Sequence, residues 1–239
     1  MKLNKIVTFF FKIKFLSFFI KNNTLAIFDL DENLICGDSS SLWNEFLIEK
    51  EIAPKSLQNV EQSLMEDYYR GELNIYKYME KTLHPLISLD TKKVDALLNE
   101  FISTKIIEIF YPDAIACIKK HKESDHKIII ISATGEHIVK KIAEYLDISE
   151  SIGIQVENIN HKFTGKILGT PSYKEGKVIR LKHWLENQRI NYHNSVAYSD
   201  SANDIPLLNF AKHAVAVNPN QQLLKYSKSK NWLVKTWKL

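Results

Sequence analysis

The segment AIFDLDENL, residues 26–34, passes from an apolar run directly into three acidic side chains, Asp29, Asp31 and Glu32. A charge held in a low-dielectric environment costs free energy unless it is paired or binds a metal ion. Like charges this close together also repel one another. The segment therefore predicts that another part of the chain, or a bound ion, compensates these charges.

Short apolar runs elsewhere in the chain are typical of strands that are buried on both faces of a sheet. They cover residues 25–30, 128–131, 195–198 and 214–217. They alternate with helical patterns at residues 112–121, 136–146, 174–188 and 202–212. This alternation predicts an α/β fold with a doubly wound parallel sheet. The segment 154–168 interrupts it, and we expect a hairpin or an irregular excursion there.

The block of residues 39–110 contains no convincing strand and has helical periodicity throughout. Its expected helices are residues 41–50, 56–69, 74–81 and 92–110. We expect this block to be a helical cap that is inserted after the first strand. The predicted organisation is an N-terminal extension (1–22), an α/β core (23–38 and 111–239) and the helical cap (39–110).

Acidic and hydroxyl side chains stand at the ends of three of the expected strands. Asp29 and Asp31 follow the first strand, Ser132 ends the run IIII, and Asp200 follows SVAYS with Asp204 four residues later. Ligands of parallel α/β sheets bind outside the carboxyl ends of the strands, so we expect these side chains to meet at one rim. Several carboxylates at one rim suit Mg²⁺, which prefers oxygen ligands.

Four motifs resemble, in order and spacing, those of the haloacid dehalogenase-like hydrolases. They are FDLDENL, the Ser132 hydroxyl after an apolar strand, YKEGKVIRLKHWL and SDSANDIPLL. The helical insertion after the first motif is similar to the cap of the phosphoserine-phosphatase-like branch, subfamily IB. The match spans residues 24–220. The resemblance implies an enzyme, a phosphatase that hydrolyses phosphoric monoesters.

The resemblance implies a role for each matching residue. Asp29 is expected to be the nucleophile that forms an aspartyl-phosphate, and Asp31 the general acid and then the general base. Ser132 is expected to hydrogen-bond a phosphoryl oxygen, and Lys177 to neutralise charge on the phosphate and the nucleophile. Lys174 competes with Lys177 for this role. Lys177 is favoured because it follows a glycine at the start of a helix, as in the family.

The resemblance also implies a Mg²⁺ site. Its expected ligands are Asp29, the backbone carbonyl of Asp31, and Asp200, with Asp204 nearby. The chain departs from the family at Asn33, where a Thr or a Val is usual. An Asn can still hydrogen-bond the backbone in a turn, so we expect activity to survive this change.

Structural explanations remain open for several of these residues. Ser132 could cap the helix that starts near residue 136, and Asp200 with Asp204 could cap the helix that follows them. Asp38 and Ser39 begin the expected cap and could face a substrate. We favour an N-cap for the helix around residue 42 as their role.

The expected substrate is a small phosphorylated metabolite, because a cap over a buried site excludes larger molecules. Phosphoserine would require an arginine that binds its carboxylate. The position near Thr82, where the branch would place that arginine, is not basic. Of the three arginines only Arg70 lies in the expected cap, where it is either a substitute or an ordinary surface residue.

Three other functions compete with a Mg²⁺-dependent phosphatase. One is a phosphotransferase or another reaction, such as dehalogenation, on the same scaffold. Dehalogenation needs no metal, so the Asp200 and Asp204 pair argues against it. A second is a receiver-like module that accepts phosphate on Asp29, although receivers lack a helical insertion at this point. The third is a catalytically silent binding protein that is tethered to a membrane.

Composition narrows the partners and the compartment. The chain of 239 residues has a net charge of +4, and removing the five lysines of residues 1–22 leaves −1. The body therefore lacks the basic surface of a nucleic-acid-binding protein. The only cysteines, Cys36 and Cys117, predict a reducing, cytoplasmic location. Cys36 as a nucleophile is disfavoured because no histidine lies in its motif. The histidine spacing predicts no zinc site.

The Phe-rich and Lys-rich segment 1–22 stands apart from the rest of the chain. It is too short and too charged to predict a transmembrane helix. We expect a non-core extension, with a weak contact to a membrane surface as one alternative and a secretory signal as another. The oligomeric state is not predicted.

Overall fold

The computed structural model describes residues 23–87, 89–189 and 191–239. The expectations for residues 1–22 lie outside the described residues. Within the described ranges, no helix is long and apolar enough to cross a lipid bilayer.

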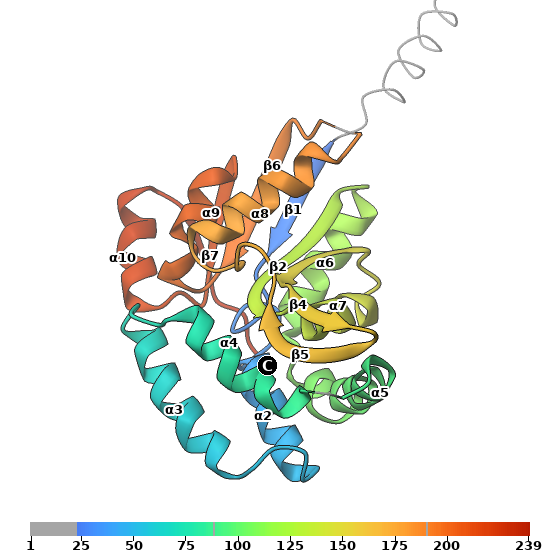
Figure 1. Ribbon diagram of the computed structural model, residues 1–239. Coiled ribbons are helices and arrows are strands. Elements are labelled where there is room, and N and C mark those ends of the chain that lie inside the picture. Colours follow the sequence, from blue (N-terminus) through green and yellow to red (C-terminus); the bar gives the residue numbers. More distant parts are fainter. Residues whose placement is uncertain (1–22, 88, 190) are drawn as a thin grey trace, which may run out of the picture.

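A six-stranded parallel sheet forms the centre of the fold (Figure 1). Its strand order is β3-β2-β1-β6-β7-β8. The strands are β1 (Thr24–Phe28), β2 (Lys127–Gly135), β3 (Glu150–Ile154), β6 (Asn194–Ser199), β7 (His213–Val217) and β8 (Leu233–Lys235). The four predicted strands correspond to β1, β2, β6 and β7, so the predicted α/β fold with a doubly wound parallel sheet is confirmed. The predicted first strand was too long, because β1 ends before Asp29.

Helices cover both faces of the sheet. They are α6 (Pro112–Glu123), α7 (Glu136–Tyr145), α8 (Glu175–Glu186), α9 (Ile205–Phe210) and α10 (Gln221–Ser229). Phe28 packs in the layer that contains α6 and α7, whereas its neighbour Ile27 packs in the layer that contains α8, α9 and α10. Successive side chains of a strand point to opposite faces, so strands that are covered on both faces need continuous apolar runs.

The direction of the strand connections reverses beside β1. From β1 the chain continues through β2 and β3 on one side, and β6, β7 and β8 lie on the other side. Such a reversal leaves a crevice at the carboxyl ends of the strands, where ligands of open α/β sheets bind. Asp29 follows β1, Ser132 lies in β2 and Asp200 follows β6. The topology therefore brings three expected site residues to this edge.

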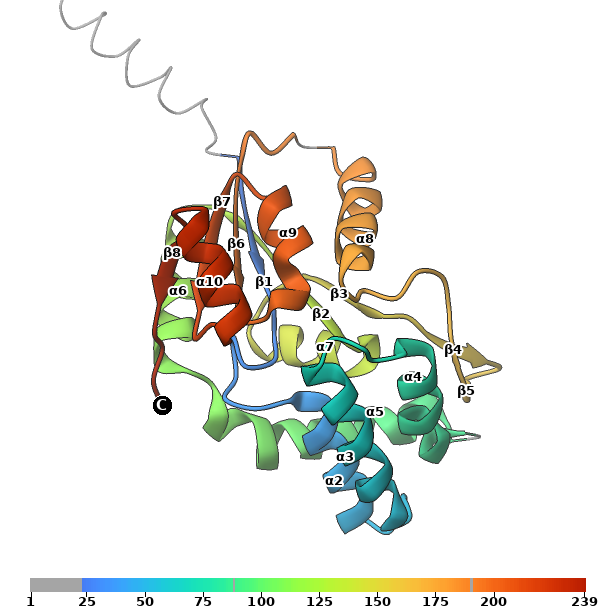
Figure 2. The same ribbon diagram turned by 90° about the vertical axis from the view of Figure 1, so that its left-hand side faces the viewer.

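The helical segment 39–110 lies beyond the carboxyl ends of the strands (Figures 1 and 2). Its helices are α2 (Ser39–Glu49), α3 (Ser56–Tyr69), α4 (Ile75–Leu83) and α5 (Thr91–Phe101). The segment also contains the 3₁₀ turns His84–Leu86 and Ile107–Ile109 and the π-helical turn Ile102–Ile106. A further 3₁₀ turn, Ala202–Asp204, precedes α9 in the core. The division into a core and a cap at the predicted boundaries stays a prediction.

The expected continuous helix over residues 92–110 was wrong. The α-helix α5 ends at Phe101, and a π-helical turn follows it. The hydroxyl of Thr104 donates a hydrogen bond to the carbonyl of Glu100 at 2.8 Å. A side-chain hydroxyl that binds the carbonyl one turn earlier competes with the helical backbone ladder. Helical periodicity persists through this segment, but the hydrogen-bond pattern does not.

Three further elements complete the fold. Of the two alternatives for residues 154–168, the structure has the hairpin, as the antiparallel pair β4 (Val156–Ile159) and β5 (Lys162–Ile167). It binds the helical segment, since the amide of Thr91 donates to the carbonyl of His161 at 2.8 Å. Sequence analysis missed β3, which contains Gly153, and β8, which has three exposed residues.

Candidate active site

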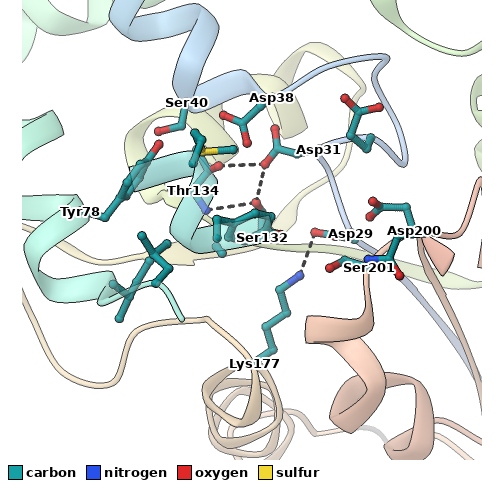
Figure 3. A pocket seen from close by; sticks show the side chains of 17 residues that line it. Asp29, Asp31, Asp38, Ser40, Tyr78, Ser132, Thr134, Lys177, Asp200 and Ser201 are labelled. Carbon is teal, nitrogen blue, oxygen red and sulfur yellow. Dashed lines mark hydrogen bonds and ion pairs between the residues drawn. The ribbon is translucent and has the colours of Figure 1, made fainter. Parts of the chain in front are cut away.

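A pocket of about 120 Å³ lies between the carboxyl edge of the sheet and the helical segment 39–110 (Figure 3). Its core side includes Asp29, Asp31, Ser132, Thr134, Lys177 and Asp200. The side chains that face them from the helical segment are Ser40, Met65, Tyr68, Leu73, Ile75 and Tyr78. Segments that lie far apart in the sequence therefore enclose one space.

Lys177 supplies the cation that compensates the acidic side chains of residues 26–34. Its Nζ donates hydrogen bonds to Oδ1 of Asp29 at 2.8 Å and to Oδ2 of Asp204 at 2.7 Å. The lysine side chain is only 3% exposed. Burial lowers the pKa of Lys177, but the charges of Asp204 and Asp29 outweigh this effect and the net shift is upward. Lys177 is therefore charged at neutral pH.

The turn before α8 aims Lys177 at Asp29. A Cβ atom on Gly176 would lie 1.9 Å from the carbonyl oxygen of Pro171, so only glycine fits at this position. The hydroxyl of Ser172 donates to the carbonyl of Ser132 at 2.6 Å and ties the turn to β2. The glycine that favoured Lys177 in the sequence thus has a steric reason.

Asp29 and Asp200 carry charges that this pocket disfavours. Burial raises the pKa of Asp29 well above its usual value, Lys177 lowers it, and the charges of Asp204 and Asp200 raise it again. Burial, followed by the charge of Asp204, likewise raises the pKa of Asp200. A buried and a half-buried carboxylate that repel each other fit a divalent cation, because Mg²⁺ is usually held by one or two carboxylates together with water and phosphate oxygens.

The side chains of the other two expected metal ligands are engaged elsewhere. Oδ2 of Asp204 accepts hydrogen bonds from Lys177 and, at 2.8 Å, from the hydroxyl of Ser199. Within the described ranges, no three or more His, Cys, Asp and Glu side chains are arranged to hold a metal ion by themselves. A Mg²⁺ ion at this rim would therefore rest on Asp29, Asp200 and backbone or substrate oxygens.

Asp31 is held in place by three donors. The amide of Ser39 donates to its Oδ1 at 2.6 Å, and the hydroxyls of Ser132 and Thr134 donate to its Oδ2 at 3.0 and 2.9 Å. Figure 3 shows the two hydroxyl contacts beside the pair of Asp29 and Lys177. The Asp31 carboxylate, two residues after Asp29, therefore has a fixed position.

Thr134 was missed by sequence analysis. It follows Ser132 by two residues on the same strand, and side chains two residues apart share a face. That spacing was the available signal. The pocket side formed by Tyr68 and Tyr78 had no comparable signal, because helical periodicity does not reveal which face of a helix meets a distant strand.

Asp38 both caps α2 and lines the pocket. Its Oδ1 accepts a hydrogen bond from the amide of Ser41 at 2.7 Å, which confirms the favoured N-cap interpretation. Burial, followed by the nearby charge of Asp31, raises the pKa of Asp38 to about 7. The other interpretation, a carboxylate that faces the ligand space, also describes its position in Figure 3.

The structure decides between the two alternatives for Arg70 and corrects the expectation for Asn33. Arg70 is an exposed surface residue that pairs with Asp67 at 2.5 Å and with Glu72 at 3.3 Å, and it does not line the pocket. Asn33 is completely buried, and its side-chain nitrogen and oxygen have no hydrogen-bond partner among the described residues. The expected hydrogen bond from the Asn33 side chain to the backbone was therefore wrong.

Comparisons with known proteins agree with this geometry. The sequence profile of the haloacid dehalogenase-like hydrolases matches residues 26–209. The chain is 35% identical over 221 residues to a histidinol-phosphatase of Neisseria meningitidis, a match that covers 90% of this chain and 99% of the relative.

Solved structures are also similar. A Bordetella pertussis protein superposes with a TM-score of 0.84 at 30% identity, covering 90% of this chain and 98% of the other. A phosphoserine phosphatase solved as a phospho-aspartyl intermediate analogue has a TM-score of 0.63 at 21% identity, over 90% of this chain and 94% of the other, which shows the fold. The chain therefore belongs to the haloacid dehalogenase-like hydrolases, as a phosphatase of their phosphoserine-phosphatase-like branch.

Proposed function

We propose that this phosphatase uses Mg²⁺ to hydrolyse a small phosphomonoester and that Asp29 is phosphorylated during the reaction. The observation that carries the proposal is the contact between Lys177 and Asp29 at 2.8 Å, in a pocket where hydroxyl groups hold Asp31 nearby. An acidic nucleophile beside a fixed cation suits attack on an anionic phosphate.

The reaction has two steps. A carboxylate oxygen of Asp29 attacks the phosphorus, the bond from phosphorus to the ester oxygen breaks, and protonated Asp31 donates its proton to that leaving oxygen. Asp31 then takes a proton from a water molecule, which attacks the same phosphorus and releases inorganic phosphate and free Asp29. Lys177 hydrogen-bonds the phosphoryl oxygens in both steps, and the Ser132 hydroxyl turns from Asp31 to a phosphoryl oxygen when the substrate is bound.

Asp29 and Asp200 are the side chains that would hold Mg²⁺. The ion supplies positive charge that lets the anionic phosphate approach the Asp29 carboxylate. Asp204 supports the site indirectly in this proposal, because it orients Lys177.

The residues that line the pocket indicate which leaving group fits. Among the described residues that line the pocket, Lys177 is the only lysine or arginine. Asp38 and Glu32 add carboxylates to the lining, and Tyr68 and Tyr78 add aromatic rings. This lining disfavours a substrate with its own carboxylate and favours one with an amine and an apolar or aromatic body.

We infer that histidinol phosphate is a substrate. Its ester carries an ammonium group and an imidazole ring, which suit Asp38 and the tyrosine-lined side of the pocket. The Neisseria meningitidis relative is named as a histidinol-phosphatase, which agrees with this preference. Phosphoserine differs in having a carboxylate, for which the described part of the pocket lining offers no second cation.

A substrate panel tests the proposal. Purified protein with MgCl₂ is assayed for phosphate release from histidinol phosphate, phosphoserine and other phosphorylated metabolites, beside Asp29→Asn and the matched control Asp125→Asn. Asp125 is exposed and its backbone is left-handed, which Asn tolerates. We expect release that requires Mg²⁺, is fastest with histidinol phosphate, and disappears only in Asp29→Asn. A wild-type rate in Asp29→Asn contradicts the mechanism, and faster phosphoserine turnover contradicts the substrate.

A further inference from the structure

A lysine of the core contacts the helical segment at the edge of the active site. The Nζ of Lys174 donates a hydrogen bond to the carbonyl of Gly71, in the connection between α3 and α4, at 2.8 Å. Gly71 lies beside Tyr68 and Ser201, two residues that also line the pocket. In the sequence, Lys174 was the alternative to Lys177 as the phosphate-binding lysine. In the structure the Lys177 side chain contacts Asp29, whereas the Lys174 side chain contacts Gly71.

The Lys174 contact falls just beyond the C-terminal end of α3. Arg70 is the C-cap of α3, Gly71 follows it with a φ of +75°, and the last turn of α3 has no basic residue. The C-terminus of a helix carries partial negative charge and unpaired carbonyls, so a cation is stabilising there. Lys174 adds a second cation beside Arg70 at this end, from across the pocket edge.

Lys174 has an unusual backbone conformation, which gives weight to the contacts of its side chain. Lys174 has a φ of +51° and a ψ of −124°, a conformation that glycine adopts without a steric penalty and a lysine does not. A residue that is held in such a conformation needs compensating contacts. The Lys174 ammonium group has two, the carbonyl of Gly71 and the face of the Tyr173 ring, 5.2 Å from the ring centroid.

A second pair of residues joins the same two parts of the chain. The rings of Tyr68 in α3 and Tyr173 in the core lie 6.2 Å apart between centroids. Tyr68 lines the pocket. Burial, followed by the charges of Asp200 and Asp29, raises the pKa of Tyr68, so its hydroxyl is protonated beside the acidic cluster.

We propose that Lys174 is a positioning residue: by binding the Gly71 carbonyl it holds the end of α3 against the core and so keeps Tyr68 over the acidic cluster during phosphoryl transfer. The inference rests on the proposed function, because closure of the helical segment matters through exclusion of water from that reaction. Lys174 is the N-cap residue of α8 and Lys177 lies in the first turn of that helix, so the start of α8 contacts both the nucleophile and the closing segment.

Proteolysis tests the contact without relying on catalysis. The chain has arginines only at positions 70, 180 and 189, and Arg70 is exposed, so an arginine-specific protease reports the Arg70–Gly71 bond directly. Loss of a charge-assisted hydrogen bond shifts a local opening equilibrium by roughly tenfold. We expect Lys174→Met to be cleaved at this bond about tenfold faster than wild type. Lys182→Met, an exposed lysine change on the same helix, is expected to match wild type.

Two further variants separate the contact from general stability. Lys174→Arg keeps a donor and is expected to restore slow cleavage. Lys174→Gly relieves the backbone conformation, so we expect it to melt at or above the wild-type temperature and still be cleaved faster. In the kinetic assay, Lys174→Met is expected to lose about tenfold in kcat/KM for histidinol phosphate, and Lys174→Arg to recover most of it.

The outcomes of the two proposals are distinct. Wild-type cleavage at Arg70–Gly71 in both Lys174→Met and Lys174→Gly overturns the role of Lys174, whatever their activity. Equally fast cleavage of Lys182→Met also overturns it, because the effect would not be specific. Full activity in Asp29→Asn overturns the proposed mechanism and leaves the proteolysis result unaffected.

Discussion

Replacing Lys177 by methionine removes the cation between two buried carboxylates. Its Nζ lies 2.8 Å from Oδ1 of Asp29 and 2.7 Å from Oδ2 of Asp204, and the side chains of these carboxylates are 9% and 2% exposed. At an effective dielectric constant of about 20, each contact contributes roughly 6 kcal/mol of attraction before desolvation is subtracted. Breaking a buried pair costs about 3–5 kcal/mol, because the remaining charge is left uncompensated.

We therefore expect Lys177→Met to lose about 3–5 kcal/mol of unfolding free energy. The loss is measured by urea unfolding in EDTA, which removes any contribution from bound divalent cations, with fluorescence of buried tryptophans such as Trp43 as the signal. Lys182→Met controls for the loss of an exposed lysine on α8. We also expect phosphatase activity to fall by at least about 10²-fold, since Lys177 is proposed to bind the phosphate directly.

A double-mutant cycle tests the electrostatic reasoning. Asp204→Asn removes one of the two charges that Lys177→Met would leave unpaired. We expect the double variant to be more stable than the sum of the single losses predicts, by about 1–3 kcal/mol. Strictly additive losses, or a loss below about 1 kcal/mol in Lys177→Met, would refute the view that Lys177 compensates this cluster.

Three further results are expected. Burial lowers the pKa of His137 to about 4, below its unfolded value near 6.5, so the unfolded state binds more protons and stability falls as pH drops through this window. In urea titrations at pH 5, His137→Phe should abolish roughly 2 kcal/mol of this loss of unfolding free energy. An unchanged pH profile would show that His137 is not responsible. Glu32 has a φ of +52°, so Glu32→Gly should raise the unfolding free energy by about 1 kcal/mol, and a lower melting temperature would argue against backbone strain there. Asp38→Asn keeps an N-cap acceptor but loses the charge, so KM for histidinol phosphate should rise about tenfold while that for p-nitrophenyl phosphate stays constant, and equal changes would remove Asp38 from ammonium recognition.

Much of the site was predictable because topology, rather than detailed packing, brings it together. Asp29, Ser132 and Asp200 each follow or end an apolar run, and parallel strands deliver such positions to the same edge of a sheet. A local hydrogen bond was also predictable from the sequence, as the N-cap at Asp38 shows. These features depend on spacing along the chain or on the rule that connects strands.

Features that depend on packing in three dimensions were not predictable. The directions of Lys174 and Lys177 depend on one left-handed residue and on the tight fit of Gly176 against Pro171. The tyrosine-lined side of the pocket depends on how the helices of segment 39–110 lie over the sheet. Periodicity indicates that a helix has a buried face, but it does not specify what that face covers.

The π-helical turn after α5 shows a third kind of limit. Residues 92–110 keep an apolar pattern that suits a continuous helix, yet hydroxyl groups at Ser103 and Thr104 bind the carbonyl of Glu100. A competition between side-chain and backbone donors for one carbonyl is decided by small energy differences, which a pattern of apolar residues does not report.

Direct detection of phosphate on Asp29 tests the central claim most closely. Enzyme that is turning over histidinol phosphate with Mg²⁺ is quenched in acid, digested and analysed by mass spectrometry. We predict that one phosphate is found on the peptide that contains Asp29, that it disappears when substrate is exhausted, and that it is absent from Asp29→Asn. Substrate turnover with no phosphorylated Asp29, or with the phosphate on another residue, would contradict the account.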